Sequence, residues 1–194
     1  MLMLEPRDLS PRQQEVLDTV EAVFLREGLR PVRIGRLAEE ARCSRSTLYE
    51  LAPSKEELFL LVLDRMIRRT RRHSAEAIDR ERDPEARLKV ALSSTALSFA
   101  PITTTFIEAV HEYRPARLLL EHQLAEARAT IERLIDDAVA SGRFRAVNSR
   151  VVADGLMAVV DRFADPEFVR DSGVDSSVAL GEFFDLMIGG LQRL

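Results

Sequence analysis

Cysteine, proline and glycine are scarce in this chain of 194 residues. Its single cysteine, Cys43, excludes an internal disulfide and a zinc site built from several cysteines. Eight glycines and eight prolines are too few for a fibrous or low-complexity protein. Hydrophobic residues make up 46% of the chain and charged residues 31%, which is the balance of a folded globular protein. At about 150 residues per domain, the length predicts one domain or two small ones.

Long hydrophobic runs are also missing. The longest stretch without a charge, residues 90–107, contains seven serines and threonines and Pro101. A transmembrane helix needs roughly 20 mostly apolar residues, so this stretch is not one. The first residues carry proline and charges where a secretory signal has its apolar core. We therefore expect a soluble cytoplasmic protein with no membrane partner.

Apolar residues recur at helical spacing along nearly the whole chain, and no segment alternates convincingly at period two. Ser10 and Gln13 form a capping box that predicts a first helix, which Gly28 ends. Asp83-Pro84 predicts a later helix start, whereas we expect residues 165–176 to be a loop. The pattern predicts an all-α fold of about nine helices, including segments near 10–28, 32–41, 45–51, 117–141, 149–164 and 177–194, a long helix that begins at Ser54 and another that begins at Asp83-Pro84.

Residues 32–58 read VRIGRLAEEARCSRSTLYELAPSKEEL, which predicts two short helices joined by a tight turn. This is the helix-turn-helix arrangement, whose second helix enters the major groove of DNA. Arg45, near the start of the second helix, is suited to bind a guanine edge through two hydrogen bonds. Thr47, Tyr49 and Lys55 suit phosphate contacts. The predicted DNA-binding residues are Arg33, Ser44, Arg45, Ser46, Thr47, Tyr49 and Lys55.

Local charge supports this interpretation. Residues 30–55 carry six basic and three acidic side chains, although the whole chain has a net charge of −4. Basic side chains that contact phosphates supply much of the affinity for DNA, and contacts to base edges supply the specificity. The alternative is an ordinary helical hairpin at the protein surface.

The same residues resemble the TetR family of bacterial transcriptional repressors. The resemblance is strong over about residues 10–65, and its most specific parts are Thr47-Leu48-Tyr49 and the run Ser54 to Leu58. It implies a recognition helix at about residues 45–51 and phosphate contacts from Tyr49 and Lys55. It also implies a homodimer formed by the last two helices and a small-molecule pocket in the C-terminal part. The chain departs from the family pattern at Arg42, where glycine is usual, and at Ala52, where an aromatic residue is usual.

We therefore expect a helix-turn-helix DNA-binding domain at residues 1–53 and a helical effector-binding and dimerisation domain at residues 54–194. The uncharged, hydroxyl-rich run at residues 90–107 favours a buried pocket, because ligand pockets are mostly apolar with a few placed polar groups. The alternative is a simple core whose hydroxyls bond to carbonyls of their own helices. The candidate pocket residues are Phe99, Thr103, Phe106, Ile107, His111, Tyr113, His122, Met157 and Phe163. The candidate dimer-interface residues are Val152, Leu156, Val159, Phe163, Phe183, Phe184, Met187 and Leu191.

No catalytic or metal-binding pattern accompanies these features. Glu108 and His111 have the spacing of one half of a di-iron motif, but the second half is absent. No glycine-rich phosphate loop is present, so we expect neither an enzyme nor a cofactor. The hypothesis is a repressor released from a palindromic operator by a small-molecule effector. Its alternative is a DNA-binding dimer that is constitutive or regulated by a protein partner.

Overall fold

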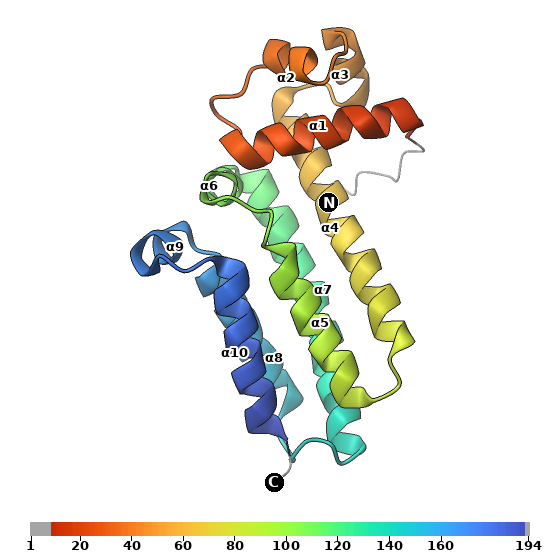
Figure 1. Cartoon of the computed structure of the whole chain (residues 1–194), viewed down its shortest axis with the longest axis vertical. Helices are drawn as coiled ribbons and strands as arrows, with labels where there is room; N and C mark the ends of the chain where they lie inside the picture. The colour runs from red at the N-terminus through yellow and green to blue at the C-terminus, as the bar shows by residue number, and fades with distance from the viewer. Residues whose placement is uncertain (1–8, 193–194) are drawn as a thin grey trace. The chain divides into compact units, whose positions relative to one another are not determined.

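The computed structural model describes residues 9–192, and this part of the chain is almost entirely helical (Figure 1). It confirms the predicted all-α class. Apart from one isolated bridge between Phe144 and Gln192, these residues form no strand pairing. The ten helices of the described residues are α1 (Pro11–Glu27), α2 (Ile34–Glu40), α3 (Arg45–Leu51), α4 (Lys55–Arg80), α5 (Pro84–Ser98), α6 (Thr104–Glu112), α7 (Arg114–Ala140), α8 (Ser149–Phe163), α9 (Pro166–Ser172) and α10 (Ser176–Leu191).

The ends of the helices follow local side-chain chemistry. Ser10 and Gln13 form the predicted capping box of α1, and Gly28 ends that helix with a φ of 71°. The prediction of a loop at residues 165–176 was wrong, because α9 lies within it. Asp165 accepts a hydrogen bond from the Glu167 N–H and Pro166 occupies the first turn. This is the same Asp-Pro start that correctly predicted α5.

The helices form two compact units. The first unit comprises the described part of Met1–Arg68 together with Ile102–Leu119, and the second comprises Arg69–Pro101 and the described part of Leu120–Leu194. The domain boundary predicted after residue 53 therefore lies inside the first unit, which also contains the start of α4 and all of α6.

An aromatic cluster lies at the centre of the first unit. Phe59 of α4 contacts Phe24 of α1 edge-to-face, with ring centroids 5.2 Å apart, and contacts Phe106 of α6 at the same separation. All three rings are buried. Such pairs add about 0.5–1.5 kcal/mol to the gain from burying the rings. The cluster thereby fixes α1, α4 and α6 to one another within the unit.

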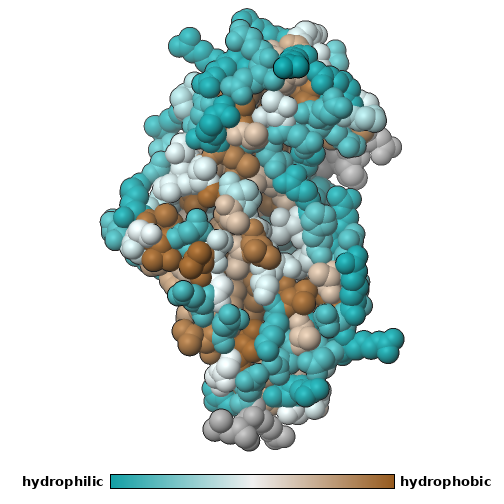
Figure 2. All heavy atoms as spheres, in the orientation of Figure 1, coloured by the Kyte–Doolittle hydropathy of each residue, from teal (hydrophilic) through white to brown (hydrophobic). Residues whose placement is uncertain are grey.

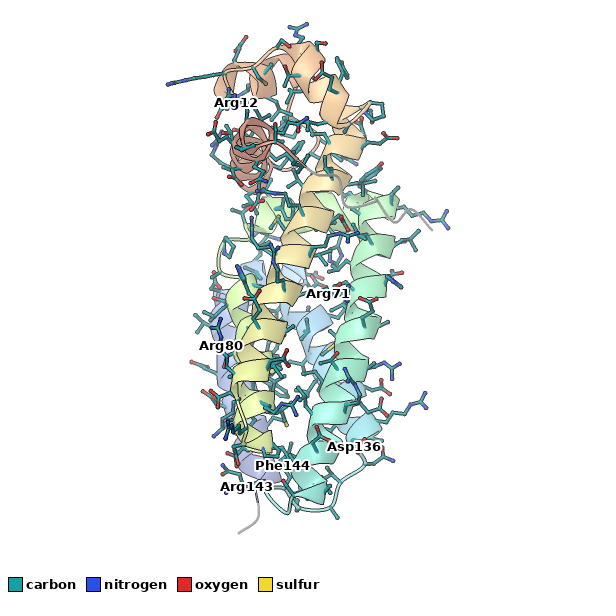
Figure 3. The ribbon with its side chains drawn as sticks, turned by 90° about the vertical axis from the view of Figure 1, so that its right-hand side faces the viewer. Arg12, Arg71, Arg80, Asp136, Arg143 and Phe144 are labelled. Atoms are coloured by element: carbon teal, nitrogen blue, oxygen red, sulfur yellow. The ribbon has the colours of Figure 1, made fainter. Side chains whose placement is uncertain are left out.

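The second unit is a helical bundle with a mainly aliphatic core. α10 packs against α5 and α8, and α7 contributes a buried stripe that includes Ile131, Leu134, Ile135 and Ala138. The loop after α7 closes the core with Phe144, whose side chain is fully buried and is labelled in Figure 3. None of the helices in the described residues is long and apolar enough to cross a membrane.

Several large apolar side chains of the second unit face solvent. On α8 and α10, Val151 is 66% exposed, Val178 51% and Leu186 76%. Gly155, Ala158, Gly189 and Gly190 are also exposed on these two helices. Figure 2 shows hydrophobic residues at the surface over α9 and α10. Exposed apolar side chains on neighbouring helices make this surface a candidate for association with another molecule.

Candidate nucleic-acid interface

Residues 34–51 form the predicted pair of short helices. Leu37 and Ala38 of α2 and Leu48 and Leu51 of α3 are all buried, so the two helices pack together through small and aliphatic side chains. The turn between them passes through Arg42, whose φ is 47°. That value lies in the left-handed region, where a residue other than glycine is strained.

A side chain from α1 supports this turn. The Arg12 guanidinium donates hydrogen bonds to the carbonyls of Ala41 (3.0 Å) and Arg42 (2.9 Å), and the side chain is labelled in Figure 3. These bonds hold the two peptide groups that flank the strained residue, and they join α1 to the helix-turn-helix. Nothing in the spacing of the sequence identified Arg12, because its partners are backbone atoms about thirty positions away.

The start of α3 is held by Ser44. Its hydroxyl oxygen accepts the Thr47 N–H at 3.0 Å, and the two hydroxyls lie 2.9 Å apart. Ser44 is thus the N-cap of the second helix, in keeping with the preference of helix starts for serine.

The remaining predicted side chains of α3 face solvent. Arg45 and Ser46 are exposed. Tyr49 is 51% exposed, although large aromatic side chains are usually buried. An exposed tyrosine with a free hydroxyl suits a contact to the DNA backbone. Arg33, at the N-cap of α2, is exposed as well. The structure therefore brings Arg33, Ser44, Arg45, Ser46 and Tyr49 to the surface of one helix pair.

The local excess of positive charge is smaller than the sequence indicates. Arg36 forms ion pairs with Glu27 and Glu40, and Arg30 pairs with Glu112 at 3.0 Å. These charges are neutralised within the first unit. Arg33, Arg42 and Arg45 are the exposed guanidinium groups that residues 30–55 retain for phosphates or bases.

Lys55 is placed differently from the other predicted residues. Its Nζ donates to the carbonyls of Leu29 (2.8 Å) and Arg30 (3.3 Å), and it lies 4.0 Å from the Glu56 carboxylate. The side chain is only 20% exposed. Lys55 thus closes the linker between α1 and α2 onto the start of α4. Its predicted contact with a phosphate remains a prediction.

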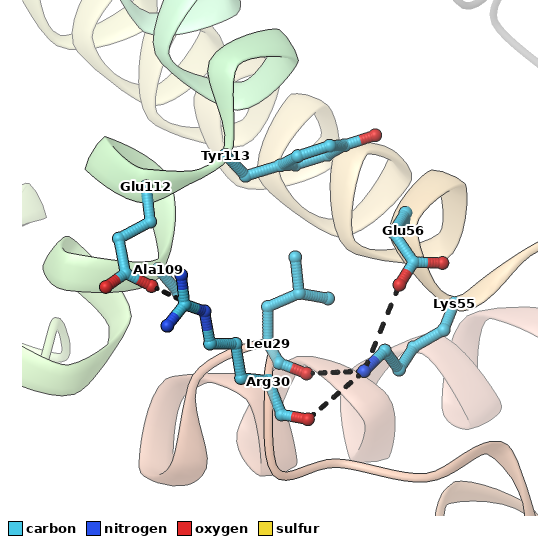
Figure 4. Close-up of a pocket in the computed structure, with 7 residues that line it drawn as sticks. All are labelled: Leu29, Arg30, Lys55, Glu56, Ala109, Glu112 and Tyr113. Carbon is cyan, nitrogen blue, oxygen red and sulfur yellow. Dashed lines mark hydrogen bonds and ion pairs between the residues drawn. The ribbon is translucent and has the colours of Figure 1, made fainter.

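The same linker borders a pocket of about 290 Å³ in the first unit (Figure 4). Its walls mix charge of both signs, and burial followed by the nearby Glu56 and Glu57 raises the pKa of Tyr113. The pocket is lined by Leu29, Arg30, Lys55, Glu56, Ala109, Glu112 and Tyr113. Tyr113 is the one residue that it shares with the predicted effector pocket.

The predicted pocket residues are divided between the two units. In the first unit, the Thr103 hydroxyl donates to the Leu25 carbonyl and caps α6, and Phe106 and Ile107 are buried in the core. These side chains hold α6 against α1, which the sequence did not show. Thr103, Phe106, Ile107, His111 and Tyr113 belong to the first unit, and Phe99, His122, Met157 and Phe163 to the second.

In the second unit, Phe99, Met157 and Phe163 are partly buried against the hydrophobic core. The ring of Phe163 stacks on Phe168 of α9 at 4.7 Å. His122 faces solvent and lies 3.6 Å from Glu126. Among the hydroxyls of the uncharged run, Thr95 donates to the carbonyl of Ala91, as in the alternative of a simple core.

The predicted dimer-interface residues have two different environments. Leu156, Phe184 and Leu191 are buried in the core of a single chain, so these three side chains are not available to a second protomer. The prediction is corrected for them, because helical spacing alone does not distinguish a face turned to the chain's own core from one turned to a partner. The other five residues are partly buried against the core and lie next to the exposed surface: Val152, Val159, Phe163, Phe183 and Met187.

Cys43, in the turn before α3, is partly buried, and this burial raises the pKa of its thiol. Reactive cysteines have a lowered pKa, so Cys43 has the character of a packing residue.

Residues 16–62 match the model of a protein family described as bacterial regulatory proteins, tetR family. No curated protein sequence matches the chain significantly. Among solved structures, the chain is similar to a protein from Saccharomonospora viridis in complex with choline, with a TM-score of 0.77 and 19% identity over 93% of this chain and 97% of that one. The fatty acid degradation regulator FadR from Bacillus halodurans has a TM-score of 0.74 and 16% identity, over 96% of this chain and 100% of that one.

AibR, in complex with isovaleryl coenzyme A and operator DNA, has a TM-score of 0.65 and 17% identity, over 93% of this chain and 98% of that one. At these identities the similarity is one of fold. It extends over nearly the full length of both chains.

Proposed function

Because the chain belongs to the TetR family of bacterial regulatory proteins, we propose that it is a dimeric repressor that binds a palindromic operator and is released by a small-molecule effector. The observation that carries the DNA-binding part is the exposed face of α3, where Arg45, Ser46 and Tyr49 project from a buried Leu48–Leu51 base. A helix that is buried on one side and carries donors on the other is suited to the major groove.

Within this face, each side chain has a distinct role. Arg45 lies at the first position of α3 and presents a fork of donors that matches the O6 and N7 atoms of guanine. Tyr49, Arg33 and the Ser44–Thr47 hydroxyl pair contact phosphates and set the register of the helix on DNA. Lys55 holds the α1–α2 linker in place and thereby positions Arg33 at the start of α2.

Dimerisation is proposed to use the exposed surfaces of α8 and α10. Val151, Val178 and Leu186 supply apolar contacts, and the exposed glycines Gly155 and Gly189 allow two helices to approach closely. Two recognition helices about 34–36 Å apart then read successive major-groove turns, so the operator has two half-sites related by a two-fold axis.

The effector is proposed to bind the second unit near Met157 and Phe163. AibR and the Saccharomonospora viridis protein were solved with an acyl coenzyme A and with choline, which supports a ligand-responsive role for this fold. The effector must bind the DNA-free state more tightly than the DNA-bound state, since equal affinity shifts no equilibrium. The densely buried core of the second unit favours the alternative, a dimer whose DNA binding does not depend on a ligand.

The test begins with selection of bound sequences from a random duplex library, followed by fluorescence anisotropy on the enriched DNA. We expect an inverted repeat that contains a guanine in each half-site, bound by two protomers. The variant Arg45→Ala is expected to lose about five- to hundredfold in affinity for that repeat and to bind random DNA as before. Enrichment of no sequence over random DNA would overturn the proposal.

The effector is tested on the same complex. A panel of acyl coenzyme A esters and quaternary amines is added at increasing concentration, with unrelated nucleotides as controls. Saturable release of DNA by one class supports the repressor model. Retention of DNA under the whole panel, in a protein that binds its operator tightly, supports the ligand-independent alternative.

A further inference from the structure

The guanidinium group of Arg45 lies directly over a glycine of the neighbouring helix. Gly35 is in the first turn of α2, and Arg45 is the first residue of α3. A Cβ atom placed on Gly35 would lie 2.7 Å from Nη2 of Arg45, 3.3 Å from its Cζ and 3.4 Å from its Nε. A Cβ atom at 2.7 Å from Nη2 overlaps that nitrogen, so a side chain at residue 35 would displace the guanidinium.

The backbone itself does not require glycine at this position. The glycines with a positive φ are Gly28, Gly142 and Gly173, and Gly35 is not among them. Gly28 shows the contrast, because a Cβ there would also meet the backbone carbonyl of Thr105 at 3.0 Å. Glycine within a helix is less favourable than alanine, and α2 has only seven residues. The steric demand that the structure shows at Gly35 is the room taken by the Arg45 side chain.

We propose that Gly35 is a specificity-determining residue, because its missing side chain sets where the Arg45 guanidinium lies and hence which base edge it reads. The inference rests on the proposed function, in which Arg45 contacts guanine. Arg45 touches the base and Gly35 does not, so Gly35 is a positioning residue. The absence of a Cβ atom at Gly35 leaves room for the guanidinium beside the first turn of α2.

This arrangement explains how a single arginine on a short helix gains directional specificity. Two parallel hydrogen bonds to O6 and N7 of guanine need the plane of the guanidinium to meet the plane of the base. A long side chain that is free to rotate loses conformational entropy when it is fixed in that orientation. A guanidinium that already occupies the space beside Gly35 has fewer orientations to lose on binding.

A methyl group at residue 35 is expected to reduce the discrimination between bases without lowering the stability of the fold. The atoms it displaces are at the far end of a flexible side chain, so the fold can accommodate it by moving the guanidinium. Alanine also favours the helix more than glycine does. We therefore expect Gly35→Ala to unfold at the same or a higher temperature than the wild type and to discriminate bases less well.

The experiment is a double-mutant cycle read out on operator variants. Wild type, Gly35→Ala, Arg45→Ala and the double variant are each titrated by anisotropy against the selected operator. They are also titrated against operators in which the guanine of each half-site is changed to the other three bases. We expect Gly35→Ala to reduce the preference for guanine at least fivefold. In the Arg45→Ala background, the same substitution is expected to change nothing.

Gly35→Ser serves as a second variant that adds a Cβ atom, and it is expected to affect the same base position. Affinity for random DNA and its dependence on salt are expected to stay at wild-type values in both, because no phosphate contact is removed. Unchanged guanine preference in both variants would overturn the inference while the proposed function stands. An equal effect with and without Arg45 would overturn it too, since the glycine would then act through the fold. A wild type that prefers no sequence would overturn the proposed function as well.

Discussion

Each of the two units is stabilised internally by a different kind of interaction. In the first unit, polar side chains donate to backbone carbonyls of distant segments: Arg12 to the helix-turn-helix turn, Lys55 to the α1–α2 linker, and Thr103 to the end of α1. In the second unit, α5, α7, α8 and α10 are joined mainly through an aliphatic core, and side-chain bonds to distant carbonyls, from Ser176 to Phe163 and from Arg145 to Gly190, lie at the ends of α8 and α10. Directional bonds fix one geometry, whereas an apolar core tolerates small shifts between helices.

This difference matches the tasks proposed for the two units. A DNA-reading surface needs its side chains at fixed positions, because hydrogen bonds to base edges weaken steeply with misalignment. A unit that takes up a ligand and a second protomer needs apolar surface and the ability to adopt more than one packing. The exposed apolar side chains of α8 and α10 belong to the second unit alone, and the following predictions test this division.

The largest effect is expected for a charge placed in the proposed dimer surface. Leu186→Glu is expected to give a folded monomer whose operator affinity is at least about a hundredfold lower, because the two half-sites are then no longer bound together. Sedimentation velocity measures the mass and anisotropy the affinity. Leu97→Glu on α5, where the leucine is 69% exposed, is the matched control and is expected to stay dimeric. A Leu186→Glu protein that is as dimeric as wild type would refute the assigned surface.

A smaller effect is expected from the ion pair between α4 and α1. Arg65 contacts the nearly buried Glu21 at 3.2 Å and Asp18 at 2.6 Å. Arg65→Ala removes this ion pair from the nearly buried Glu21 carboxylate and is expected to lower the free energy of unfolding by about 2 kcal/mol, less than for a fully buried pair because the Arg65 side chain is 23% exposed. Urea denaturation measures the loss.

The matched control for Arg65 lies in the second unit. Arg143 pairs with Asp83 at 2.8 Å, but both side chains are exposed. Arg143→Ala is therefore expected to cost less than about 1 kcal/mol. Equal losses for the two substitutions would show that the ion pairs do not distinguish the units.

The next prediction concerns the two roles open to Lys55. Lys55→Met removes the bonds to the carbonyls of Leu29 and Arg30 and is expected to lower the free energy of unfolding by about 1–2 kcal/mol. If Lys55 acts only as this tie, the slope of log affinity for DNA against log salt concentration stays as in wild type. A slope that becomes shallower by about 1.8, which is about 0.9 for each of the two protomers, would instead show the phosphate contact predicted from the sequence.

The sequence predicted the helix-turn-helix well because its information is local. Helical spacing gave α2 and α3, Ser44 was recognisable as a cap, and the exposed face of α3 followed from the buried Leu48 and Leu51. Arg12 and Gly35 were missed for the opposite reason. Each acts on a segment that only folding brings near, and that contact follows no regular spacing in the sequence.

The predicted dimer-interface residues were less precise, because the same helical spacing of apolar residues describes a face packed in the chain's own core and a face that contacts a second protomer. Phe184 and Leu191 repeat with helical spacing, as does any residue of a core-facing stripe. Their burial in one chain, and the exposure of Leu186, become visible only when α10 is packed on α5. In the same way, the uncharged run at residues 90–107 predicted a pocket. In the structure, Thr103 and Phe106 from this run instead hold α6 to α1 and α4.

The smallest effect is expected at the strained turn. Arg42 has a φ of 47°, and glycine adopts this conformation without a Cβ clash. Arg42→Ala keeps the strain and removes the charge, whereas Arg42→Gly removes both. The glycine variant is expected to be more stable than the alanine variant by about 1 kcal/mol in urea denaturation. Both are expected to bind the operator with the same affinity, because Arg12 still holds the carbonyls on either side of the turn. A weaker glycine variant would show that the strain at Arg42 itself sets the angle between α2 and α3.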